Sequence, residues 1–199
     1  MKEFDLEKYS SLAMEPLYKK YGKVVNVVGL TIESNGPEAR LGDICYIYPD
    51  IHAGKGIMAE VVGFKNEKVI LMPFEAVDGI GSGSLVENSK EPLMVQVSNQ
   101  VLGRTLDGLG RAADGLDAIY GTKYTVEAPP PNPMSRVIIN EVLPLGVKAV
   151  DGLITVGKGQ RLGIFAGSGV GKSTLMGMFA RNTKADINVI ALIGERGRE

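Results

Sequence analysis

The stretch Ala166-Gly-Ser-Gly-Val-Gly-Lys-Ser-Thr174 decides how the second half of this chain folds. It follows a short apolar run, Arg161-Leu-Gly-Ile-Phe165, and it precedes Leu175–Arg181, which can continue as a helix. Its glycines tolerate backbone conformations that a Cβ forbids, so the chain can wrap closely around an anion. Backbone N–H groups and the helix N-terminus then face the phosphate oxygens. The pattern predicts a strand, a phosphate-binding loop and a helix, in that order.

The residues expected to surround the phosphates share this one loop, and they are Gly167, Ser168, Gly169, Val170, Gly171, Lys172, Ser173 and Thr174. Lys172 is placed to reach the β and γ phosphates, and the Ser173 hydroxyl to ligate Mg²⁺ that arrives with the nucleotide. Ala166 stands where the usual pattern has glycine, so only the relaxed form of the motif matches. The alternative is a glycine-rich turn that caps an ordinary helix. In either case we expect Met176, Met178 and Phe179 to face the core.

A second apolar run, Asp186-Ile-Asn-Val-Ile-Ala-Leu-Ile193, predicts a central strand buried on both faces. A right-handed crossover would make it parallel to the strand before the loop, so the carboxyl ends of both strands would share one edge of the sheet. The second strand would deliver Glu195 to that edge. From spacing alone, Glu195 either orients an attacking water near the γ-phosphate or is a solvated loop charge.

Composition excludes several classes of protein. The 199 residues include 22 basic and 23 acidic side chains, which argues against a dedicated polyanion binder. A hydrophobic content of 44% is normal for a globular core. No apolar stretch approaches membrane-spanning length, and the start of the chain lacks the apolar core of a signal peptide. We therefore expect a soluble protein that is not exported.

The chain has one cysteine and one histidine. A single cysteine cannot form an internal disulfide, and Cys45 lies in the apolar segment Ile44–Ile47, so we expect a buried structural thiol in a cytosolic protein. His52 stands alone in a loop without nearby ligands. We expect a surface residue there and no histidine metal site.

The first half of the chain predicts a small β-barrel over residues 21–92, preceded by a helix or mobile arm over residues 1–20. Turn signals at 34–36, 49–50, 65–67 and 81–83 separate short β-type segments, which are Lys23–Val28, Asp43–Tyr48, Met58–Val62 and Val69–Met72. Oligonucleotide-binding barrels use basic grooves and stacked aromatic side chains. This stretch has no basic cluster, so we expect a structural or assembly role and no nucleic acid partner.

Two short features lie between the barrel and the phosphate loop. Residues 103–108 and 110–115 both read Gly-Arg-x-x-Asp-Gly, which predicts a pair of turns. The run Ala128-Pro-Pro-Pro-Asn-Pro133 predicts a stiff, extended segment. It could dock into an aromatic groove of a partner, but a surface strap within the domain is the favoured interpretation.

Beyond single motifs, residues 21–199 resemble the flagellum-specific type III protein export ATPases. Two long runs, Leu145–Thr174 and Ala191–Glu199, carry the resemblance. Shorter matches support it, at Val28–Thr31, Gly36-Pro37, Leu41–Cys45, Gly103–Gly115 and Pro131–Pro133. The Ala166 start is normal in this family, which is related to the type III secretion ATPases and to the catalytic subunits of rotary ATP synthases. One departure is Ala112-Ala113, where relatives often carry proline and an aliphatic residue.

The resemblance implies a multi-domain β + α/β protein, with an N-terminal β-barrel followed by a RecA-like ATPase domain that begins at residue 93 and a C-terminal helical domain. It implies a homohexamer that binds ATP and Mg²⁺ at subunit interfaces through Lys172 and Ser173. Glu195 matches the family's catalytic carboxylate, and Arg196 is expected in the same pocket.

The same resemblance implies an ATPase that drives protein export from the cytoplasm, bound peripherally to the inner face of the cytoplasmic membrane. Its partners would be a regulator, stalk proteins, the export gate and chaperone-bound substrates. Alternatives are a catalytic subunit of rotary ATP synthases, a non-catalytic nucleotide-binding ring subunit and an RNA-translocating hexamer.

The family also needs an aspartate at the end of a later strand to hold Mg²⁺, and Asp186 begins its strand instead. The sequence is therefore expected to be an N-terminal portion of a longer protein, inactive by itself, with apolar faces left uncovered.

Overall fold

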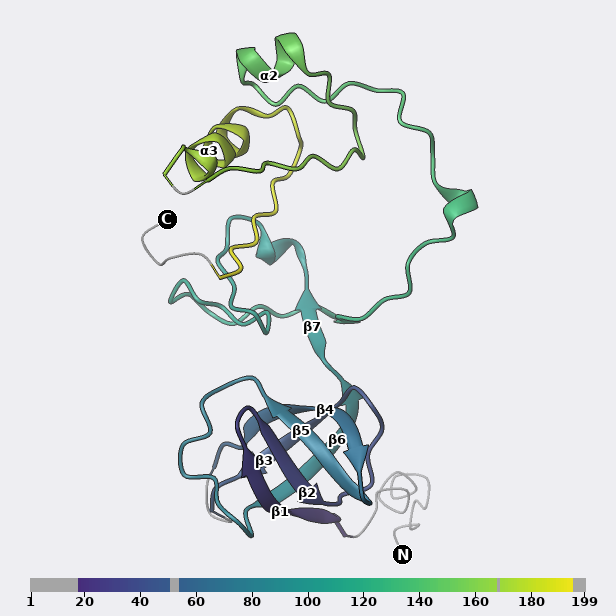
Figure 1. The fold of residues 1–199 in the computed structure, drawn as a ribbon, viewed down its shortest axis with the longest axis vertical. Coiled ribbons are helices and arrows are strands. Elements are labelled where there is room, and N and C mark those ends of the chain that lie inside the picture. The colour runs from purple at the N-terminus through teal and green to yellow at the C-terminus, as the bar shows by residue number, and fades with distance from the viewer. Residues whose placement is uncertain (1–17, 51–53, 168, 195–199) are drawn as a thin grey trace, which may run out of the picture. The chain divides into compact units, whose positions relative to one another are not determined.

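The structure, a computed structural model, describes residues 18–50, 54–167 and 169–194 of the chain (Figure 1). The chain divides into two compact units, with the boundary between Pro129 and Pro130. The arm expected over residues 1–20 lies almost entirely outside the described residues, and so does His52.

The first unit is built on a closed, antiparallel β-barrel, as the sequence predicts. Around the barrel the strands follow the order β1-β2-β5-β4-β3-β6, and β1 pairs with β6 to close it. The six strands are β1 (Tyr21–Val28), β2 (Thr31–Asn35), β3 (Asp43–Tyr48), β4 (Ile57–Lys65), β5 (Lys68–Pro73) and β6 (Leu85–Pro92). Closure leaves no strand edge of the barrel open to another chain.

The sequence predicts four of these strands and misses two. The missed strand β2 carries Ser34 and Asn35, which favour turns, yet its residues alternate between half-buried and buried positions. The other missed strand, β6, ends in the polar run Glu87–Pro92. Both segments become strands because neighbours on each side pair with their backbones, and pairing outweighs the intrinsic preferences of the side chains.

The inner face of the barrel forms one apolar core. Its fully or almost fully buried members are Val24, Ile32, Cys45, Ile47, Ala59, Val61, Val69, Leu71 and Val86. The Cys45 thiol is completely buried, and this burial raises its pKa to about 12. The prediction of a buried structural thiol is therefore confirmed.

Two tight features bring the barrel strands close to one another. The β4–β5 hairpin turns at Asn66 and Glu67, which both have positive φ values of 49° and 62°, as a two-residue primed turn requires. At Gly22 of β1, a Cβ would lie only 2.0 Å from the carbonyl oxygen of Gly36. Glycine is needed there because the backbone after β2 passes directly over β1.

The rest of the first unit contains a small antiparallel sheet and the predicted pair of turns. The sheet consists of β7 (Met94–Val97) and β8 (Thr122–Thr125), and the short helix η1 (Asn99–Val101) follows β7. In each Gly-Arg-x-x-Asp-Gly repeat, the aspartate carboxylate accepts a hydrogen bond from the N–H two residues later. These bonds join Asp107 to Leu109 and Asp114 to Leu116.

An ion pair joins the two repeats. The Arg104 guanidinium donates to both carboxylate oxygens of Asp114, with Nε 2.5 Å and Nη2 2.9 Å away. The second repeat's arginine, Arg111, contacts Glu75 just after β5. Ala112 forms an antiparallel bridge with Leu106.

The second unit contains a short helix η2 (Pro133–Ser135), α2 (Lys148–Leu153) and α3 (Lys172–Asn182). The proline-rich segment before η2 is exposed, and the boundary between the two units falls within it. Helix α3 follows the glycine-rich loop as predicted.

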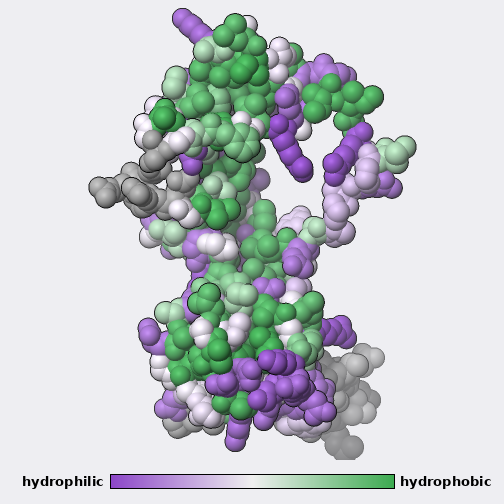
Figure 2. Space-filling model, viewed as in Figure 1, coloured by the Kyte–Doolittle hydropathy of each residue, from purple (hydrophilic) through white to green (hydrophobic). Residues whose placement is uncertain are grey.

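The two strands predicted at 161–165 and 186–193 are absent from the described part of the second unit, so that prediction is wrong for this structure. Both segments are extended, without ladder partners in the described ranges. Residues expected in the core are exposed instead: Val189 is 91% accessible and Ile193 87%. The physical reason is that an extended segment becomes a strand only where a neighbour pairs with its N–H and C=O groups. Figure 2 shows the resulting apolar surface on the visible face of this unit.

None of the helices in the described ranges is long and apolar enough to cross a membrane.

We expect Leu71→Ala to destabilise the barrel by about 3 kcal/mol, because Leu71 is fully buried and its removal leaves a cavity in the core. Met72 lies on the same strand and is 43% exposed, so Met72→Ala should cost less than about 1 kcal/mol. Urea unfolding followed by tyrosine fluorescence measures both values. Equal losses for the two variants would contradict the assignment of inner and outer faces.

The Arg104–Asp114 pair makes a prediction about pH. Hydrogen bonds from the Arg104 guanidinium, and then from the N–H groups of Leu116 and Thr105, hold the Asp114 pKa far below its ordinary value of 3.8. A lowered pKa in the folded state stabilises the fold above the unfolded pKa, and the stabilisation is lost as pH falls. Asp114→Asn should therefore lower the melting temperature at pH 7, and its difference from wild type should shrink below about pH 4. Substitution of the exposed Asp78 by Asn is the matched control.

Candidate functional site

The candidate site is the loop at the start of α3. The first bond of the helix runs from the Leu175 N–H to the Gly171 carbonyl oxygen, at 2.9 Å. Gly171 is the N-cap, with φ 98° and ψ 21°, and it has no side chain to accept from the N–H groups of the first turn. An 11-residue helix carries a partial positive charge at this end, so the site favours an anion.

The loop backbone fits a phosphate group. Gly169 and Gly171 have φ values of 77° and 98°, in the left-handed region that favours glycine. A Cβ built at either residue, or at Gly167, would meet no atom within 4 Å. The space beside these three glycines is therefore open, and an anion can approach the backbone there.

The predicted site residues are distributed along this loop. Lys172 is half-buried at the first position of α3, whereas Val170, Ser173 and Thr174 are exposed. Ser168, Glu195 and Arg196 lie outside the described residues. The described chain ends at Gly194, with φ 67°, directly before Glu195.

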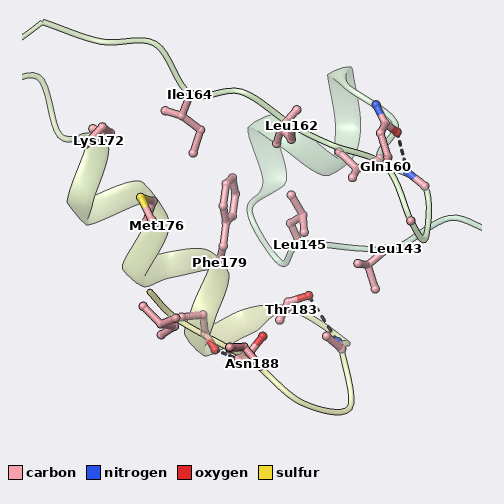
Figure 3. Close-up of a pocket in the computed structure, with 17 residues that line it drawn as sticks. Leu143, Leu145, Gln160, Leu162, Ile164, Lys172, Met176, Phe179, Thr183 and Asn188 are labelled. Atoms are coloured by element: carbon pink, nitrogen blue, oxygen red, sulfur yellow. Dashed lines mark hydrogen bonds between the residues drawn. The ribbon is translucent and has the colours of Figure 1, made fainter. Parts of the chain in front are cut away.

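An apolar groove of about 600 Å³ lies on the side of α3 that faces the extended segments (Figure 3). The Phe179 ring points from α3 into this groove toward Leu162 and Leu145. Among the described residues that line it, Lys172 is the one charged side chain, and this residue also belongs to the candidate phosphate loop. Met176 and Phe179 line it, but Met178 does not. The expectation that all three face a core is not met, because no residue of α3 is buried and Met176 is 42% exposed.

The segment before the loop is held by its own contacts. The Leu143 N–H donates to the Val156 carbonyl oxygen at 2.8 Å, and the Lys158 N–H donates to the Glu141 carbonyl oxygen at 2.9 Å. The side chains of Lys158 and Glu141 also form an ion pair of 2.6 Å, which raises the pKa of Lys158 and lowers that of Glu141. These contacts close the segment into a loop that leads into Arg161.

Among the described residues, no group of three or more histidine, cysteine, aspartate or glutamate side chains could hold a metal ion. Within the loop, the Ser173 hydroxyl is the side-chain oxygen that the sequence motif assigns to a cation arriving with the nucleotide.

Comparisons with known proteins find a β-barrel domain followed by a nucleotide-binding domain. Residues 24–90 match the ATP synthase alpha/beta family, beta-barrel domain, and residues 146–199 match the nucleotide-binding domain of the same family. The chain is 52% identical over 189 residues to the flagellum-specific ATP synthase of Bacillus subtilis, which covers 94% of this chain and 43% of the relative. It is 47% identical to the type 3 secretion system ATPase of Xanthomonas euvesicatoria, over 94% of this chain and 42% of the relative.

Solved structures show the same likeness. The assembled ATPase EscN of the type III secretion system of enteropathogenic E. coli matches with a TM-score of 0.79 and 42% identity. The match covers 89% of this chain and 42% of that one. EscN in complex with its central stalk EscO matches with a TM-score of 0.76 and 41% identity, over 89% of this chain and 43% of that one. The chain thus spans less than half the length of the relatives it matches.

Proposed function

We propose that this chain, which belongs to the ATP synthase alpha/beta family, binds ATP with Mg²⁺ at its phosphate loop as part of a flagellar or type III protein export ATPase. The observation that carries the proposal is the start of α3. There Gly169 and Gly171 adopt left-handed conformations directly before Lys172, beside open space. The relatives named as flagellar and secretion ATPases supply the export role.

Each part of the loop has a distinct task in this proposal. Backbone N–H groups of the loop surround the phosphates, and those residues are Gly167, Ser168, Gly169, Val170 and Gly171. Lys172 contributes a positive charge to the β and γ phosphates, and the Ser173 hydroxyl ligates Mg²⁺, with Thr174 beside it. Bound Mg²⁺ neutralises negative charge that develops on the phosphate oxygens.

Hydrolysis needs a water molecule that attacks the γ-phosphorus while the bond to the bridging oxygen breaks. We assign the orientation of that water to the Glu195 carboxylate, with Arg196 in the same pocket. The assignment is supported by the match of Ala191–Glu199 to the family pattern. A glutamate at this position also argues for a catalytic subunit over a non-catalytic nucleotide-binding one.

The proposal includes an assembly and a location. We assign residues 1–20 to an arm, residues 21–92 to the barrel and residues 93–199 to the beginning of a RecA-like domain. The protein would work as a homohexamer in the cytoplasm, at the inner face of the cytoplasmic membrane. The similarity to EscN, which was solved in complex with its central stalk EscO, supports a stalk protein as one partner. Others would be a regulator, the export gate and chaperone-bound substrates.

The phosphate loop is tested first by Lys172→Ala in the natural polypeptide that carries these residues. Removing a charged hydrogen-bond donor from the phosphates should weaken MgATP binding about a hundredfold. Isothermal titration calorimetry measures the affinity. Lys148→Ala removes an equal charge from an exposed position of the same unit and should leave the affinity unchanged. Unchanged binding in Lys172→Ala would refute the assignment.

The role of Glu195 predicts a different pattern. Glu195→Gln should leave MgATP affinity largely intact, because the carboxylate acts on water and not on the nucleotide. Turnover in a phosphate-release assay should fall by about a hundredfold or more. Hydrolysis close to the wild-type rate would show that another group orients the water.

A further inference from the structure

We propose that Asp151 is a positioning residue for the phosphate loop. It orders a turn that packs on the C-terminal end of α3, and through that helix it fixes where Lys172 and Ser173 lie. The inference rests on the phosphate-binding role proposed above and adds to it a residue that does not touch the nucleotide.

Asp151 holds the turn through both of its carboxylate oxygens. Oδ1 accepts a hydrogen bond from the Leu145 N–H, and Oδ2 accepts one from the Gly146 N–H, each at 2.8 Å. Bonds from backbone N–H groups to a charged carboxylate are shorter and stronger than neutral ones. Because the two oxygens accept from two successive N–H groups, the carboxylate fixes both the position and the orientation of the turn.

The ordered turn contacts the end of α3 directly. The Pro144 carbonyl oxygen accepts hydrogen bonds from the Lys184 N–H at 3.2 Å and from the Thr183 hydroxyl at 3.3 Å. Gly146 has φ 77°, and a Cβ there would lie 2.3 Å from the carbonyl oxygen of Asn182, the last residue of α3. The two backbones therefore pack against each other with no side chain between them.

This contact matters at the other end of the helix because α3 is a continuous, rigid element. Its 11 residues span roughly 15 Å from Asn182 to Lys172. A shift of the C-terminal end therefore moves the N-terminal end, where the anion would bind.

The same framework also holds the chain that enters the loop. The bonds of Leu143 with Val156 and of Lys158 with Glu141 close the segment that contains Asp151 and leads into Arg161. The chain before the loop and the helix after it are thus tied to one another at the Asp151 turn. The Asp151 turn thus acts on the loop through the helix that begins at its end.

The test compares four variants in the natural polypeptide that carries these residues, with MgADP as the probe. Asp151→Ala removes both acceptors and Asp151→Asn leaves one, so affinity should fall about tenfold in the first and less in the second. Gly146→Ala perturbs the same contact from the opposite side and should also weaken binding about tenfold. Asp186→Asn is the control, since it removes an exposed carboxylate of the same unit from outside the turn and outside the closed segment, and it should bind as wild type does.

Hydrogen exchange separates positioning from general stability. In Asp151→Ala, amide exchange should accelerate about tenfold in residues 166–182 relative to Asp186→Asn, at a temperature where both variants are folded. If Asp151→Ala lowers the melting temperature but leaves both MgADP affinity and this exchange unchanged, the residue is merely structural and the inference is overturned. Asp151→Asn serves as the deciding variant should Asp151→Ala fail to fold.

Failure of the proposed function gives a different result. If the wild-type protein does not bind MgADP, the phosphate-binding role fails. Exchange in residues 166–182 then still decides whether Asp151 holds α3.

Discussion

Three residue pairs between β1 and β6 close the barrel, and the rest of the first unit depends on that closure. An extended backbone must hydrogen-bond its N–H and C=O groups, and a ring of six strands lets every strand do so on both sides. Closure also directs alternate side chains inward, where they form one apolar core. The Cys45 thiol in that core is sealed from solvent, which is why burial raises its pKa.

The second unit shows what happens when an extended backbone has no neighbour to pair with. Its two apolar segments at 161–165 and 186–193 have the residues of strands, but the described chain offers them no ladder partner. They remain extended and largely exposed, and α3 covers only one side of them through Met176 and Phe179. The order of this unit comes instead from polar contacts of the backbone, above all those made by Asp151.

Much of this could be predicted from residue types alone, because the physics involved is local. Four barrel strands, the turn at Asn66 and Glu67, the paired turns of the Gly-Arg-x-x-Asp-Gly repeats and the helix after the phosphate loop all follow from short patterns. Strands β2 and β6 could not be found in this way. Their side chains favour turns or solvent, and only pairing with distant neighbours makes them strands. Gly146 and Asp151 were missed as well, although an aspartate five residues after a glycine turn is a usable signal for such a contact.

The sequence by itself determined that a glycine-rich loop with positive φ values would lead into a helix at Lys172, since tolerance of positive φ is a property of the glycines themselves. It also determined that a barrel would form ahead of that loop. Only the tertiary structure decided which strands pair, that β1 meets β6, and that a turn well before the loop packs on the far end of α3. Those outcomes depend on which backbone groups come into contact. Contacts between residues far apart in the sequence leave no pattern in either local segment, so the sequence alone does not reveal them.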